Sequence, residues 1–277
     1  MAKLIFLYLL FFVVGMMALK LLVVLLEPRL TFFPIRGLDT TPEKAGLQFK
    51  EIPLQTADEE TVYAWLLEHP EPKSEVLFFH GNGGNLSLNQ DFLLSLYHHS
   101  LTVFALDYRG YGKSTGSPTE EGLYQDAEAL LRQFWNKIHR PDQKVIYWGH
   151  SLGGSVAAFA TTVRKPDGVI LESSFPNKYS LLNHHPALKV LGFLSEFKFS
   201  TAEFLDGISR PVLVLHGEQD KIVPLKQGQL LFERLQTEKY FHTIPAGHND
   251  LHQVDPDKYW EHINQLIDAM GDGQDLH

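Results

Sequence analysis

Ser151 stands where a nucleophile could act, at the centre of Gly149-His150-Ser151-Leu152-Gly153, which has the spacing G-x-S-x-G. An apolar, β-rich run precedes this stretch, and an alanine-rich run with a helical pattern follows it. A serine in a sharp strand-to-helix turn exposes its hydroxyl to substrate, and the residues two positions away must be small because the turn crowds them. The sequence therefore predicts that Ser151 is a catalytic nucleophile.

A serine hydroxyl is a weak nucleophile unless a base removes its proton and an acid orients that base. With a turn of this kind, the expected chain order is serine, acid, histidine. Asp220 follows the β-rich run 211–217, and His248 follows the run 240–244. We predict that His248 is the base and Asp220 its acid; Glu172, at the end of an earlier run, is the alternative acid.

The loop His80–Asn85 (HGNGGN) follows another apolar run and is rich in glycine. Glycine lets a backbone approach a neighbouring group closely, so such a loop can bring N–H groups next to a nucleophile. We predict an oxyanion hole made by the N–H groups of Leu152 and Asn82, with Gly83 as the alternative to Asn82. A tight turn without a catalytic role is the other interpretation of this loop.

Several other chemistries lack support in the sequence. The chain has no cysteine, which excludes thiol nucleophiles and Cys-zinc sites. The run 112–114 (GKS) resembles the end of a P-loop, but Asp107 stands where its first glycine would be needed. The spacing of His242, His248 and His252 could suggest a metal, yet no H-E-x-x-H motif is present. We predict no metal site.

Composition and charge indicate an ordinary globular chain. Its 277 residues are 44% hydrophobic and 21% charged, and 24 Lys and Arg against 33 Asp and Glu give a net charge of −9. Nucleic-acid binding normally requires the opposite charge balance, so we expect no nucleic-acid partner.

The first thirty residues include the apolar run Leu4–Leu26, which only Lys20 interrupts. At about 1.5 Å per residue, a helix of this length spans a ~30 Å hydrocarbon core. We predict that residues 1–30 are a single-pass membrane anchor. A cleaved signal peptide is the alternative, although no clear A-x-A site follows and the apolar run is long for one. Lys and Arg on the two sides show no clear bias, which leaves the side of the catalytic domain open.

From residue 47 onward, β-rich runs alternate with helical patterns, which predicts an α/β domain over residues 47–270, joined to the anchor by a linker (31–46) and followed by a tail (271–277). Continuous apolar runs in the middle indicate a parallel sheet, and the first two runs indicate an antiparallel hairpin. The predicted strands are 47–54, 61–68, 75–80, 101–107, 144–149, 168–173, 211–217 and 240–244. The predicted helices lie near 88–99, 119–138, 152–164, 224–236 and 255–269.

The interval between the strands 168–173 and 211–217 is longer than one returning helix needs and is rich in aromatic residues. An insertion at the carboxyl end of such a strand is where a cap forms over a site. We predict a small cap at about 175–208, with Phe175, Phe193 and Phe197 as substrate-binding residues. A crossover helix with a long loop is the alternative.

Five motifs in order resemble those of the α/β-hydrolase fold: HGNGGN, the run 107–129, GHSLGGS, LHGEQDKIVP and IPAGHND. The resemblance covers about residues 47–265 and is greatest to the membrane-anchored subgroup that includes protein depalmitoylases and lysophospholipid hydrolases. It implies an eight-stranded sheet, no cofactor and a triad of Ser151, Asp220 and His248. It also implies that Asp107 and Arg109 pair near the sheet edge. IPAGHND is shorter than the usual G-x-G-H connection, which could shift the histidine.

These observations predict a serine hydrolase that cleaves carboxylic esters or thioesters through an acyl-enzyme. A membrane anchor and an apolar cap suit a small-molecule or lipid-like acyl substrate. Two alternatives remain: a serine peptidase or amidase on the same triad, and a catalytically silent membrane-bound scaffold.

Overall fold

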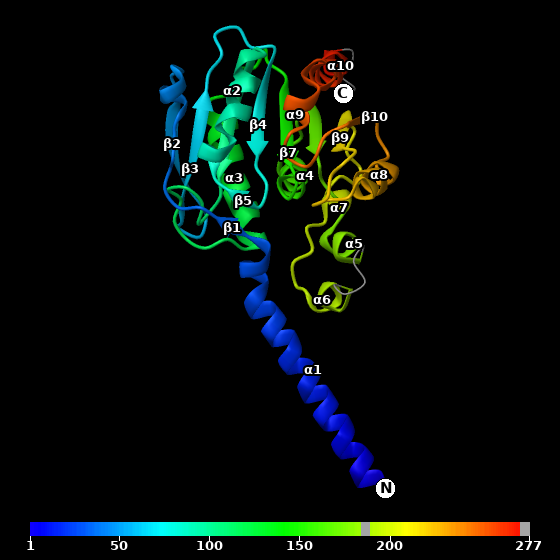
Figure 1. The fold of residues 1–277 in the computed structure, drawn as a ribbon. Helices are drawn as coiled ribbons and strands as arrows, with labels where there is room; N and C mark the ends of the chain where they lie inside the picture. The colour runs from blue at the N-terminus through cyan, green and yellow to red at the C-terminus, as the bar shows by residue number, and fades with distance from the viewer. Residues whose placement is uncertain (184–188, 272–277) are drawn as a thin grey trace.

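The computed structural model describes residues 1–183 and 189–271, and its central feature is an eight-stranded sheet (Figure 1). All eight predicted strands are present, so the predicted sheet is confirmed. Its order across the sheet is β10 (Lys239–Ile244), β9 (Val212–Gly217), β8 (Gly168–Glu172), β7 (Val145–His150), β4 (Ser74–Phe79), β6 (Leu101–Asp107), β3 (Thr61–Leu67) and β2 (Lys50–Gln55).

Neighbouring strands from β10 to β6 are parallel, whereas β3 is antiparallel to both β6 and β2. The middle strands β4, β7 and β8 are buried on both faces almost throughout, as their continuous apolar sequences require. Because these strands are parallel, their carboxyl ends lie at one edge of the sheet.

Helices cover both faces of the sheet. On one face, α3 (Glu120–Lys137), α4 (Gly153–Val163) and α8 (Leu225–Arg234) pack against the strands. The other face is covered by α2 (Gln90–His98) and α10 (Pro256–Gly271), which is preceded by the short α9 (Leu251–Val254). Successive side chains of one strand point to opposite faces of the sheet. Phe79 of β4 packs in the core under α3 and α4, and Phe78 packs in the core under α2 and α10.

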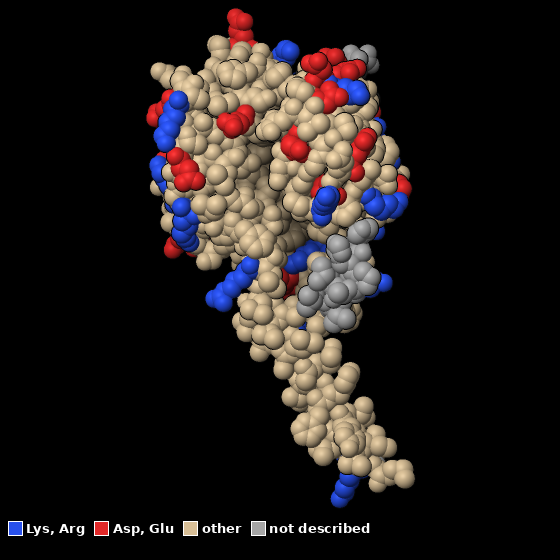
Figure 2. All heavy atoms as spheres, viewed as in Figure 1, with Lys and Arg blue, Asp and Glu red and all other residues tan. Residues whose placement is uncertain are grey.

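The N-terminal helix α1 (Ala2–Thr31) projects from the domain at the end where the cap helices lie, and α10 lies at the opposite side (Figure 1). Its segment Lys3–Thr31 is long enough and apolar enough to cross a membrane. In Figure 2 this helix is almost free of charged atoms, in contrast to the body, where Lys, Arg, Asp and Glu are scattered.

The residues that follow α1 form structure against the domain. Strand β1 (Phe33–Pro34) pairs in parallel with β5 (Gly83–Gly84), which lies inside the predicted oxyanion loop. The 3-10 helix η1 (Pro42–Ala45) follows, and a second, η2 (Leu86–Asn89), continues from the oxyanion loop. The segment between α1 and the eight-stranded sheet is therefore attached to the domain by a backbone ladder.

The interval predicted to form a cap contains three short helices, α5 (Lys178–Asn183), α6 (Lys189–Leu194) and α7 (Thr201–Phe204). In Figure 1, α6 lies beside the C-terminal part of α1. Residues 184–188 of the predicted cap and 272–277 of the predicted tail lie outside the described residues.

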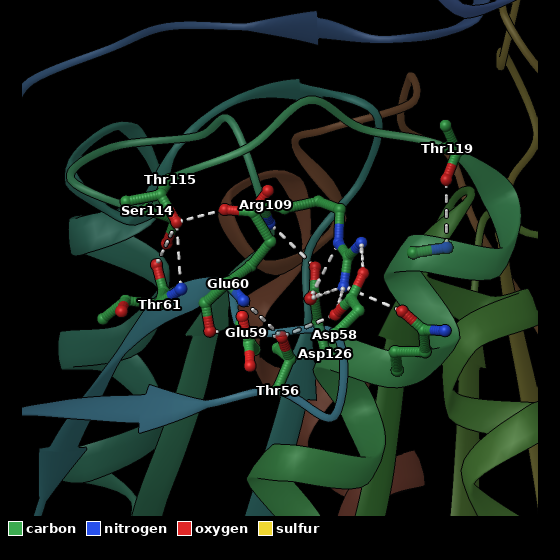
Figure 3. Close-up of polar contacts among 12 residues, drawn as sticks. Thr56, Asp58, Glu59, Glu60, Thr61, Arg109, Ser114, Thr115, Thr119 and Asp126 are labelled. Carbon is green, nitrogen blue, oxygen red and sulfur yellow. Dashed lines mark hydrogen bonds and ion pairs between the residues drawn. The ribbon is translucent and has the colours of Figure 1, made fainter.

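The predicted pairing of Asp107 with Arg109 is wrong. Arg109 instead joins Asp126 of α3, through its Nε at 3.0 Å, and Asp58 of the β2–β3 turn, through an NH1–Oδ2 contact of 2.7 Å (Figure 3). The carboxylate of Asp107 accepts the N–H of Leu86 at 2.8 Å and so supports the start of η2. Strand β6 ends at Asp107, so Arg109 lies in the loop beyond it and its side chain is directed to α3 and the β2–β3 turn rather than to Asp107.

The Arg109 network predicts a large loss of stability for Arg109→Met. This change leaves the Asp126 carboxylate, whose side chain is 0% exposed, without its cation. Losing one partner of a buried pair costs about 3–5 kcal/mol in the free energy of unfolding. Thermal denaturation of the detergent-solubilised chain should show a Tm lower by several degrees.

Asp58→Asn is the matched control, because that carboxylate is 40% exposed and its pair contributes at most about 1 kcal/mol. Burial raises the pKa of Asp126 to about 6 although the charge and hydrogen bond of Arg109 act to lower it, so removing Arg109 raises this pKa further and ionising Asp126 in the folded variant costs more. The deficit of Arg109→Met should therefore grow from pH 5 to pH 8. Equal Tm losses in the two variants would contradict this account.

Candidate active site

Ser151 lies in the sharp turn between β7 and α4, with a left-handed backbone φ of +55°. Its neighbours are glycines for a steric reason. A Cβ on Gly149 would collide with the carbonyl of Gly153, and one on Gly153 would collide with the carbonyl of Phe79 on β4. The turn is fixed further by the Ser151 N–H, which donates to the carbonyl of Glu172 at 2.8 Å. Local crowding thus selects the G-x-S-x-G spacing.

The three residues predicted as a triad are brought together at the carboxyl edge of the sheet. His248 Nε2 lies 3.0 Å from Ser151 Oγ, and its Nδ1 lies 2.6 Å from Asp220 Oδ2. Asp220 follows β9 and His248 follows β10, so two adjacent strand ends supply them. The shorter IPAGHND connection leaves the histidine within hydrogen-bond distance of the serine.

The Asp220 carboxylate is held as an oriented anion. Its Oδ1 accepts the N–H groups of Ile222 and Val223, each at 2.8 Å. Burial acts to raise its pKa, but the hydrogen bond and charge of His248, together with these two N–H groups, outweigh burial and lower the pKa. The partners assign the proton to His248 Nδ1, which leaves Nε2 free to accept the serine proton.

His150 makes no hydrogen bond to the Ser151 hydroxyl or to Asp220; its side chain instead contacts the backbone of His248. Its Nε2 lies 3.0 Å from the carbonyl oxygen of His248, so the nucleophile turn and the histidine loop are joined directly. Burial lowers the pKa of His150, and the neutral ring donates this single hydrogen bond to the carbonyl.

Glu172, the alternative acid, is engaged elsewhere. Its Oε2 accepts the Trp148 indole N–H at 3.1 Å and the Tyr259 hydroxyl at 2.7 Å, and the side chain is buried. The structure therefore brings Asp220, and not Glu172, to His248. Glu172 ties β8 to β7 and α10 beneath the nucleophile turn.

The predicted oxyanion donors lie on both sides of Ser151. Leu152 directly precedes α4, and in the described part of the chain no protein acceptor takes its N–H or that of Asn82. A Cβ on Gly81 would come 3.4 Å from the Ser151 Cβ, so the loop abuts the nucleophile. Gly83, the alternative donor, lies on β5 and pairs with Phe33.

Residues that sequence analysis did not single out hold the Asn82 peptide. Its carbonyl accepts the N–H of Phe33 at 2.9 Å and the hydroxyl of Tyr111 at 2.7 Å. The Asn82 side chain donates to the carbonyl of Thr31, the last residue of α1, at 2.8 Å. These contacts join positions far apart in the chain, and no local pattern signals them.

A cavity of about 170 Å³ opens at Ser151, lined mainly by apolar side chains from α1, the cap and the Asp220 loop. Phe175 lines it, as do Leu30 of α1 and Leu181 of α5. Of the other two predicted substrate contacts, Phe193 is 78% exposed and Phe197 packs on Phe32 with ring centroids 5.6 Å apart. Neither lines this cavity.

Within residues 1–183 and 189–271, no three His, Asp or Glu side chains are grouped as a metal site would require.

Two family models match the chain: "serine aminopeptidase, S33" over residues 70–203 and "alpha/beta hydrolase fold" over residues 170–253. Protein bem46 of Schizosaccharomyces pombe is 34% identical over 225 residues, which cover 76% of this chain and 74% of that protein. The chain belongs to the α/β-hydrolase family.

Other comparisons of this α/β-hydrolase point to ester-cleaving relatives. The lysophosphatidylserine lipase ABHD12 of Danio rerio is 35% identical over 183 residues, or 57% of this chain and 46% of that protein. The esterase Pf2001 of Pyrococcus furiosus superposes with a TM-score of 0.70 at 18% identity, covering 86% of this chain and 97% of that one. The latter likeness supports the fold.

The backbone at Ser151 predicts that glycine stabilises this position. A non-glycine residue in the left-handed region costs about 1 kcal/mol more than glycine. The Tm of Ser151→Gly should therefore exceed that of Ser151→Ala by about 2 °C, while both lose the serine hydroxyl.

Ser155 offers the matched control, because it lies inside α4, where glycine is less stable than alanine by about 1 kcal/mol. The order of the Tm values should reverse at that position. If Ser151→Gly were no more stable than Ser151→Ala, the turn would not be strained.

Proposed function

We propose that this α/β-hydrolase is a membrane-anchored serine hydrolase that cleaves carboxylic esters or thioesters through an acyl-enzyme. One observation carries the proposal: the hydrogen-bonded series Ser151–His248–Asp220 stands at a strained turn beside two N–H groups that have no acceptor among the described residues. An oriented base next to a hydroxyl that lines a cavity is the arrangement that acyl transfer requires.

In the proposed reaction, Ser151 Oγ attacks the acyl carbon while His248 Nε2 takes the hydroxyl proton. The imidazolium that forms lies 2.6 Å from the Asp220 carboxylate, which stabilises its charge. The N–H groups of Leu152 and Asn82 hold the oxyanion. His248 then gives its proton to the departing alcohol or thiol, and a water molecule, activated by the same histidine, hydrolyses the acyl-enzyme.

The apolar lining of the cavity favours an acyl group as the part of the substrate bound beside Ser151. The lipase relative ABHD12 supports a lipid-like substrate. An aminopeptidase would need an acidic group to receive the substrate's ammonium. Among the described residues lining the cavity there is no Asp or Glu, and the one charged residue is Lys178. Ester or thioester cleavage therefore fits this cavity better than peptide cleavage.

The apolar helix α1 supports the proposal that residues 1–30 anchor the enzyme in a membrane, with residues 31–46 linking it to a catalytic domain over residues 47–270. The cavity at Ser151 has Leu30 and Thr31 of α1 in its wall. The site therefore lies next to the expected bilayer surface, where a lipid-like substrate would be concentrated.

The test is hydrolysis of p-nitrophenyl butyrate by the full chain in detergent. Ser151→Ala, His248→Ala and Asp220→Asn should each lower kcat/KM by a factor on the order of 10³ or more, because each breaks the same proton path. His252→Ala, which changes a histidine outside the triad, should keep activity within a few-fold. A fluorophosphonate should label the wild type and not Ser151→Ala.

A folded wild type that neither turns over the ester nor takes up the fluorophosphonate would support the silent-scaffold alternative. Faster turnover of an aminoacyl p-nitroanilide than of the ester would support the peptidase alternative.

A further inference from the structure

A second cavity, of about 420 Å³, lies between α1 and the cap. Its wall is mostly apolar and is formed by one face of α1 together with cap residues Lys178, Leu182 and Ser195. The α1 residues recur every three or four positions, the spacing of one helical face: Leu19, Leu22, Val23, Leu26, Leu30. We call this cavity the α1 groove.

The α1 groove adjoins the cavity at Ser151. Leu30, Thr31, Lys178 and Leu182 line both. These shared residues place the groove next to the position that an acyl group bound at Ser151 would occupy. From Leu19 to Leu30 the helix rises about 16 Å, at ~1.5 Å per residue, so the groove is long as well as apolar.

A buried ion pair holds the two walls of the α1 groove together. Glu27 of α1 is 4% exposed, and its Oε1 lies 2.7 Å from Lys178 Nζ. The same carboxylate accepts the backbone N–H groups of Glu196 at 2.9 Å and Phe197 at 3.2 Å, and the Ser195 hydroxyl also contacts it. An ionised side chain inside an apolar helix end is costly unless it is paired, so these contacts fix the rotation of α1 against the cap.

We propose that the α1 groove binds the acyl chain of the substrate, so that the membrane helix is a wall of the active site. The proposal rests on the hydrolase function proposed above. The walls shared with the Ser151 cavity, the apolar face of α1 and the compensated charges of Glu27 and Lys178 all suit an uncharged hydrocarbon chain. The substrate is then a long-chain acyl ester or thioester that reaches Ser151 along α1 from the bilayer, without leaving an apolar environment.

This arrangement makes chain-length preference depend on α1. Each methylene withdrawn from water into an apolar site strengthens binding about fourfold, and an ester already dissolved in detergent or lipid gains less per methylene, chiefly from contact with the groove. Long chains that fill the α1 groove should therefore be preferred over short ones, which occupy only the cavity at Ser151. An obstruction placed along the groove should shorten the preferred chain according to its distance from Ser151.

The experiment measures kcat/KM for p-nitrophenyl esters from C4 to C16 with the full chain in detergent. Leu30→Trp, Leu26→Trp and Leu19→Trp place a bulky side chain progressively farther from Ser151. We expect the longest ester turned over at full rate to increase in that order. Leu26→Trp should lower C16 turnover at least tenfold and leave C4 turnover within threefold of wild type.

Leu25→Trp is the matched control, because Leu25 is 65% exposed on α1 and does not line the groove. It should leave the whole chain-length profile unchanged. Thermal denaturation reports in each variant that the domain is folded, and C4 turnover reports in Leu26→Trp, Leu19→Trp and Leu25→Trp that the nucleophile is active, because these three residues do not line the Ser151 cavity. Any variant that fails these two readouts is replaced by the corresponding phenylalanine.

The outcomes separate the two proposals. A wild type that neither turns over the C4 ester nor is labelled by the fluorophosphonate would overturn the hydrolase function. Normal C4 turnover, with a chain-length profile that none of the three groove substitutions alters, would overturn the α1 groove as the acyl site and leave the hydrolase function intact. Equal effects of Leu25→Trp and Leu26→Trp would also overturn it, because the effect would then not depend on which side of α1 lines the groove.

Discussion

The turn at Ser151 is the constraint on which the rest of the site depends. A left-handed serine costs about 1–3 kcal/mol and persists only where its surroundings determine it. Here the surroundings are β4, β7 and α4, which approach so closely that Gly149 and Gly153 leave no room for a Cβ. Such an approach requires rigid elements on both sides, and the fully buried centre of the sheet supplies them. The strain is thus maintained by packing that extends far beyond the turn.

The other catalytic groups reach the turn because parallel strands end at the same edge. β9 and β10 are adjacent, so the loops after them bring Asp220 and His248 side by side. The hydrogen bond from His150 to the His248 carbonyl then links that loop to the turn itself. Glu172 adds a separate support below, through Trp148 and Tyr259. Asp220 orients His248 and Glu172 holds the scaffold, although Asp220 follows one strand and Glu172 ends another strand of the same sheet.

The features that the sequence predicts correctly are those whose physical requirements leave a local pattern of residues. Buried parallel strands need continuous apolar runs, and the nucleophile turn needs glycines at a fixed spacing, so both leave local signals. The partner of Arg109 could not be predicted, because Asp58 lies 51 positions away and only the folded sheet brings it near. The three cap phenylalanines could not be ranked either. All three are equally apolar, and only the folded path of the chain places Phe175 in the wall of the Ser151 cavity and leaves Phe193 exposed to solvent.

The end of the apolar helix is the part whose role the sequence conceals most. An apolar run of this length predicts a membrane anchor, but its pattern does not indicate which part of the domain its last turn contacts. In the structure, the carbonyl of Thr31 and the N–H of Phe33 both bond to Asn82, and β1 pairs with β5 inside the same loop. The position of one proposed oxyanion donor is therefore set by the last residue of α1 and by Phe33 just beyond it. The attachment of α1 and the geometry around Ser151 are for this reason joined through Asn82.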